Sequence, residues 1–107
     1  LMFADQKDHN RSVEYYIKAN ELEPDDEIIL FNLGVVLLEL GRLQECIAVL
    51  ERGAVLAPGV DTLLKLTVAY GRNGQPDQAR AAFARARALG PQHPQVVAIA
   101  RAMAQQR

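Results

Sequence analysis

The residues of this sequence that could do chemistry are a cysteine, two histidines and a serine near acidic groups. Asp8, His9 and Ser12 resemble a nucleophilic triad, in which a carboxylate orients a histidine that activates a hydroxyl. They fall on adjacent turns at the start of a predicted helix, where an aspartate ordinarily caps the helix, and no oxyanion-hole loop is visible. We therefore predict a structural role for these three residues.

The other candidates do not form a reactive site either. His9 and His93 are the only imidazoles, and no cysteines and histidines are paired at the spacing of a zinc site. Cys46 falls at a packing position between predicted helices, so we expect an inert buried thiol rather than a nucleophile. The sequence has no glycine-rich phosphate loop. We predict no catalytic residue, no metal and no cofactor, and therefore no enzyme.

The elements that position these residues repeat along the sequence. Six registers recur at a step of 34 and then of 33 residues: Ser12, Cys46 and Ala79; Tyr16, Leu50 and Phe83; Ala19, Gly53 and Ala86; Leu22, Leu56 and Leu89; Pro24, Pro58 and Pro91; Phe3, Leu37 and Tyr70. Within each unit the apolar residues recur at intervals of three and four residues, which places them along one stripe of a helix. Because proline and glycine separate these stretches, the units are predicted to be helical hairpins.

Turn residues set the bounds of these hairpins. Gly41 and Asn73-Gly74 can supply the left-handed residue that ends a helix. The predicted helices span about 1–6, 9–22, 26–40, 43–56, 60–73, 76–89 and 94–106. We predict one domain over 1–107, with a partial first repeat at 1–24, repeats at 26–58 and 60–91, and a capping helix at 94–107. Because the chain begins at Leu1, inside a predicted helix, we expect a piece of a longer protein.

The order of residue types inside a unit resembles the tetratricopeptide repeat, which combines a period of 34 with Leu-Gly, small, aromatic and proline positions at fixed spacing. One unit supplies Leu30, Leu33, Gly34, Leu37, Cys46, Leu50 and Pro58, and the next supplies Leu63, Leu66, Thr67, Tyr70, Ala79, Phe83 and Pro91. Leucine replaces the opening aromatic in both units, Thr67 replaces the glycine, and Cys46 replaces the small alanine. The resemblance implies an all-α solenoid of antiparallel hairpins, with about three repeats and a C-terminal capping helix.

In that family the first helix of each hairpin lines a concave surface where peptides or partner helices dock. The corresponding positions here are Ile28, Phe31, Asn32, Val35, Leu38 and Glu39 in one hairpin, and Asp61, Leu64, Lys65, Val68 and Arg72 in the next. From residue 27 to 40, ten of 14 side chains are apolar and surround the helix, which indicates burial on both sides. The hypothesis is an apolar groove that binds a hydrophobic helix or strand of a protein partner. The open alternative is that adjoining repeats or a second copy cover this face.

One known binding mode of the family lacks its residues here. Some members of the family hold the C-terminal carboxylate of chaperones in a clamp of lysines and asparagines. In this sequence only Asn32 and Lys65 match the residue types of that clamp. Phe31, Val35 and Asp61 stand where cations or amides are needed. We therefore predict that an acidic C-terminal peptide does not bind tightly.

Charge and composition narrow the partners further. The net charge of −1 lacks the basic excess that binds nucleic acid or acidic lipid. Residues 1–59 hold 11 acidic and 5 basic side chains and residues 60–107 hold 2 and 7, a gradient that could steer a partner or favour head-to-tail self-association. No apolar run reaches the length of a membrane span, so a soluble chain, cytoplasmic by default, is expected. The Ala- and Arg-rich second half favours a bacterial source.

These features lead to two functional hypotheses. The leading one is a protein-interaction module that acts as a scaffold or adaptor. The alternative is a structural role, either as a self-associating spacer or as an accessory arm of a larger enzyme or envelope assembly. Concentration-dependent size in solution would separate them.

Overall fold

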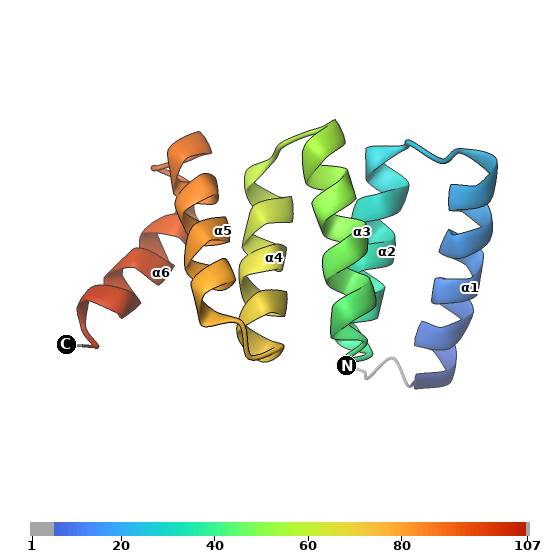
Figure 1. The fold of residues 1–107 in the computed structure, drawn as a ribbon, viewed down its shortest axis with the longest axis horizontal. Coiled ribbons are helices and arrows are strands. Elements are labelled where there is room, and N and C mark those ends of the chain that lie inside the picture. The colour runs from blue at the N-terminus through green and yellow to red at the C-terminus, as the bar shows by residue number, and fades with distance from the viewer. Residues whose placement is uncertain (1–5, 107) are drawn as a thin grey trace. The chain divides into compact units, whose positions relative to one another are not determined.

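The computed structural model describes residues 6–106, and every regular element in this range is a helix (Figure 1). The helices are α1 (Gln6–Leu22), α2 (Glu27–Glu39), α3 (Leu43–Leu56), α4 (Val60–Arg72), α5 (Pro76–Leu89) and α6 (Pro94–Ala104). From residue 26 onward the predicted helix bounds are correct to within two residues. This accuracy follows from the proline and glycine residues that separate the helices.

The predicted break between residues 6 and 9 is wrong, because α1 continues without interruption from Gln6. No glycine or proline lies between Gln6 and Leu22 to stop a helix. Asp8, where we expected a cap, lies inside the first turn of α1, a position at which a negative charge interacts favourably with the helix dipole. The remainder of the stub predicted at 1–6 lies outside the described residues.

The described residues form two compact units, which divide between Pro58 and Gly59. In the first unit α2 packs against both α1 and α3. The buried apolar residues of this unit are Val13, Leu30, Leu33, Leu37, Leu38, Cys46, Leu50 and Ala54. Because two neighbouring helices cover it, α2 is apolar around most of its circumference.

The pairing of α2 with α3 depends on one small residue. A Cβ atom built on Gly34 would lie 2.6 Å from Cγ of Leu50, a side chain with no exposed surface. At the same crossing the Cys46 thiol donates a hydrogen bond of 3.2 Å to the carbonyl oxygen of Gly34. The turn between the helices contains Gly41 at φ +74°, a left-handed conformation that favours glycine. The small residues Gly34 and Cys46 therefore let α2 and α3 approach closely.

The start of α2 is fixed by a side-chain cap. One carboxylate oxygen of Asp26 accepts hydrogen bonds from the backbone amides of Ile28 at 2.9 Å and Ile29 at 3.1 Å. These amides belong to the first turn, where no carbonyl of the helix is available to them. The neighbouring Asp25 has a different role, since it forms an ion pair with Arg52 of α3.

The second unit contains the hairpin of α4 and α5, followed by α6. Its buried apolar residues are Leu63, Leu64, Leu66, Ala69, Ala82, Phe83, Ala86 and Val96. Thr67, which stands in place of the family's glycine, donates its hydroxyl to the carbonyl oxygen of Leu63 at 2.8 Å. The polar group is thereby satisfied within its own helix. Gly74, at φ +75°, makes the turn to α5.

The final helix packs mainly against α5. His93 caps it, because its Nδ1 accepts a hydrogen bond of 3.2 Å from the amide of Gln95, while its Nε2 lies 3.3 Å from a carboxylate oxygen of Asp61. On α6, Val96 is fully buried, whereas Met103 is 43% exposed. The start of α6 is thus better packed than its end.

Candidate protein-binding surface

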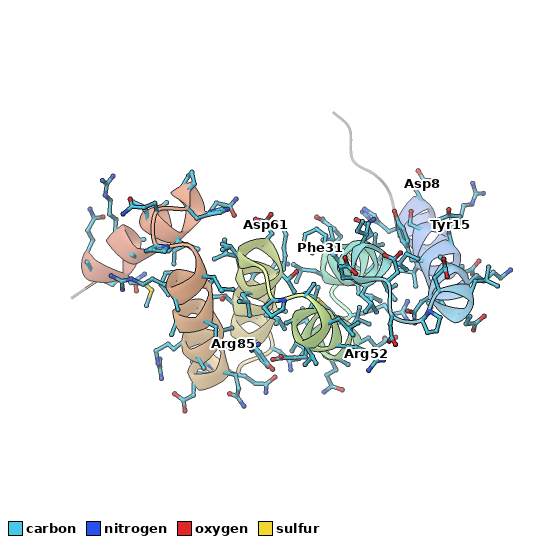
Figure 2. The ribbon with its side chains drawn as sticks, turned by 90° about the horizontal axis from the view of Figure 1, so that it is seen from above. Asp8, Tyr15, Phe31, Arg52, Asp61 and Arg85 are labelled. Carbon is cyan, nitrogen blue, oxygen red and sulfur yellow. The ribbon has the colours of Figure 1, made fainter. Side chains whose placement is uncertain are left out.

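One face of α2 carries apolar side chains that are not fully buried. Ile28 is 66% exposed, and Phe31 and Val35 are half-buried. The Phe31 side chain is labelled in Figure 2. These three residues follow one another at spacings of three and four, so they lie along one face of the helix. We call this surface, formed by Ile28, Phe31 and Val35, the α2 stripe.

Three other predicted site residues lie on α2. Asn32 is half-buried and shares the face of the stripe, and Glu39 is exposed at the end of the helix. Leu38 is only 7% exposed, so its side chain supports the helix from the core rather than offering surface to a partner. The structure therefore brings together five of the six predicted residues of this helix at the surface.

The predicted site residues of α4 form a second set within their own unit. Val68 is 40% exposed, Asp61 and Arg72 are exposed, and Lys65 is half-buried. Leu64 is only 5% exposed and belongs to the core. This set is more polar than the α2 stripe. A groove that combines the two sets stays a prediction.

A pocket in the second unit was not predicted from the sequence. It has a volume of about 250 Å³ and is lined by Thr67, Gly71, Pro76, Ala79, Arg80, Phe83, Ile99 and Met103. Small residues on α4 and α5 leave this space, and the end of α6 borders it. The small residues at Gly71 and Ala79 were a visible signal, but the position of α6 could not be known.

Acidic residues surround the start of α2. A hollow of about 470 Å³ is lined by Glu23, Pro24, Asp25, Asp26 and Glu27. Asp26 is engaged as the helix cap and Asp25 pairs with Arg52, whose side chain is labelled in Figure 2. The hollow therefore presents carboxylates directly beside the exposed Ile28.

The described residues offer little reactive chemistry. Cys46 has no exposed surface, and burial raises the pKa of its thiol to about 11, so the thiol stays protonated at neutral pH. Residues 6–106 contain no group of three or more His, Cys, Asp and Glu side chains placed to hold a metal ion. Over the same residues no helix has the length and apolarity needed to cross a bilayer.

Comparison with known families agrees with the hairpin geometry. A family model described as tetratricopeptide repeat matches residues 3–69, and a second model with that description matches residues 64–104. The chain belongs to the tetratricopeptide repeat family. The predicted family and the all-α solenoid class are thereby confirmed. Tetratricopeptide repeats are protein-interaction modules, and the family is generally not enzymatic.

Individual relatives of this tetratricopeptide chain are similar over part of their length. Hsp70-Hsp90 organizing protein 3 of Arabidopsis thaliana is 44% identical over an alignment of 55 residues that covers 48% of this chain and 10% of that protein. A solved structure of MamA from AMB-1 superposes with a TM-score of 0.75 at 26% identity, covering 87% of this chain and 51% of MamA. A mutant of MamA gives a TM-score of 0.75 at 26% identity, covering 85% and 50%. The chain spans about half of MamA.

Proposed function

We propose that this tetratricopeptide chain is a protein-interaction module that binds an apolar segment of another protein over the α2 stripe. The observation that supports the proposal is one face of α2 on which Ile28 is exposed and Phe31 and Val35 are half-buried. Contiguous apolar surface of this kind is costly to leave in water, and helices or strands of partners bind to it. Asn32 and Glu39 would provide polar contacts at its rim.

A similar role is proposed for the α4 set, taken as a surface of its own. Val68 supplies an apolar contact between Lys65 and Arg72, and Asp61 lies at the start of the helix. Both surfaces are small, so association entropy offsets much of the gain from burial, and we expect micromolar rather than nanomolar binding. Such affinity suits a scaffold or adaptor that exchanges its partners.

The test is affinity capture from the source cell, comparing the native chain with a Phe31→Glu, Val35→Glu variant. The matched control is Tyr15→Glu, Val55→Glu, which places the same charges at exposed apolar residues of α1 and α3. Proteins lost with the stripe variant and retained with the control would support the proposal. Equal capture by all three chains would contradict it. Because Phe31 and Val35 are half-buried, an Ile28→Glu variant and thermal unfolding curves separate lost binding from lost folding.

Self-association is a second candidate, favoured by the uneven distribution of charge. Residues 1–59 carry a net charge of 5 − 11 = −6, and residues 60–107 carry 7 − 2 = +5. An acidic surface on one copy would attract a basic surface on the next, which gives a head-to-tail contact. A mass that grows with concentration in sedimentation, and that high salt reduces, would support this role. A monomer over the whole concentration range would contradict it.

A further inference from the structure

The α2 stripe has a carboxylate at each end. Glu27 directly precedes Ile28, and Glu39 follows Val35 by four residues, so that it shares the face of the stripe. Both side chains are exposed. At about 1.5 Å per residue the two positions lie about 18 Å apart along the helix axis.

Among the described side chains, these two carboxylates form no ion pair within 4.0 Å. Among the side chains of residues 8–106, neither Glu27 nor Glu39 has an ion pair or a side-chain hydrogen bond, whereas Glu45 is held by Arg42 at 2.7 Å and Asp25 by Arg52. The sequence of α2 contains no lysine or arginine. The acidic ends of the stripe are therefore uncompensated.

The first unit as a whole also carries an excess of negative charge, which favours a positively charged partner. The described residues 6–58 include ten acidic and five basic side chains, and two of the five cations, Arg42 and Arg52, are already paired. The other three cations, Lys7, Arg11 and Lys18, all belong to α1. Glu23, close to the start of α2, is a further exposed carboxylate without a partner among the described residues.

From these charges we infer that the partner of the α2 stripe is a peptide segment with an apolar centre and a lysine or arginine at each end. The inference rests on the proposed function and specifies its ligand. The apolar centre would cover Phe31 and Val35, while the two cations would approach Glu27 and Glu39. A segment with acidic ends would be repelled, so the charges select the partner more than they strengthen the complex.

The test uses two fluorescent synthetic peptides with one common apolar centre and either lysines or glutamates at the ends. Their affinities are measured by anisotropy for the native chain, for Glu27→Gln, Glu39→Gln, and for the control Glu14→Gln, Glu21→Gln. The control removes the same charge from exposed positions on α1. We expect the native chain to bind the lysine peptide more tightly than the glutamate peptide. The Glu27→Gln, Glu39→Gln variant should bind the lysine peptide about fivefold more weakly than the native chain does, which is the effect expected from the loss of two exposed ion pairs. The control should match the native chain, and about 0.5 M salt should remove the preference.

The other outcomes distinguish the inference from the function on which it rests. If both peptides bind equally and Phe31→Glu abolishes both, the proposed function stands and the charge preference is wrong. If the control variant loses as much affinity for the lysine peptide as the α2 variant does, the preference arises from the net charge of the chain and the inference is overturned. If neither peptide binds, both proposals fail.

Discussion

Gly34 on α2 faces Leu50 on α3 so closely that a β-carbon on the glycine would overlap the leucine side chain. We predict that Gly34→Ala destabilises the fold by about 1–3 kcal/mol, because Leu50 is fully buried and cannot move aside without strain. The matched control is Gly71→Ala, since nothing lies within 4 Å of a β-carbon at that helical position. Alanine there should stabilise the fold by about 0.5–1 kcal/mol. Urea unfolding measures both, and changes of equal sign would contradict the prediction.

The start of α2 provides a second prediction, on the free energy of unfolding. Asp26→Ala removes a carboxylate that accepts hydrogen bonds from two backbone amides, so we expect a loss of about 1 kcal/mol. Asp25→Ala is the neighbouring control and removes only an exposed ion pair with Arg52, which should cost less than about 0.5 kcal/mol. Thermal unfolding of the two variants should therefore differ clearly. Similar losses would show that the cap is not the dominant interaction.

Cys46 should resist thiol reagents in the folded chain. Its side chain is fully buried, so a reagent cannot reach it. Its pKa is raised from 9.0 to about 11, so almost none of the thiol is ionised to the reactive thiolate at pH 8. Because the folded pKa lies above the unfolded one, this thiol's contribution to stability is complete below pH 9 and is lost as the pH rises towards 11. A chromogenic disulfide reagent should react only when urea is added, and Cys46→Ala should flatten the fall in stability between these pH values. Rapid reaction of the native chain at pH 8 would contradict burial.

An acidic C-terminal peptide of the chaperone type should not bind tightly. Only Asn32 and Lys65 have the chemistry of a carboxylate clamp, and the exposed Glu27 and Glu39 would repel such a peptide. Anisotropy titration of a labelled peptide that ends in acidic residues, beside its C-terminally amidated form, measures this. Sub-micromolar binding that depends on the free carboxylate would overturn the prediction.

The bounds of the helices could be predicted from the sequence, because proline and glycine act on the backbone where they stand. Gly41 and Gly74 adopt the left-handed conformation that the predicted turns require. The interruption expected before residue 9 failed for the same reason, since no residue near Asp8 can stop a helix. The division into repeats at 26–58 and 60–91 stays a prediction.

The candidate surface was predictable only in part. The sequence places apolar residues all around α2, and periodicity alone cannot decide which of them neighbouring helices cover. Leu38 proved to be a core residue and Ile28 an exposed one. The pocket beside Phe83 depends on the position of α6, which follows from tertiary packing rather than from local preference. Acidic residues at the ends of the stripe were visible in the sequence, but their lack of counter-ions required coordinates.

The burial of Cys46 has a practical consequence. It is the sole cysteine among 107 residues, and its side chain is fully buried, so a maleimide dye has no native attachment point on the folded chain. A single exposed position such as Ile28→Cys would therefore accept a fluorophore selectively, without first replacing the native residue. Partner binding to α2 could then be followed by a reporter located at the surface itself.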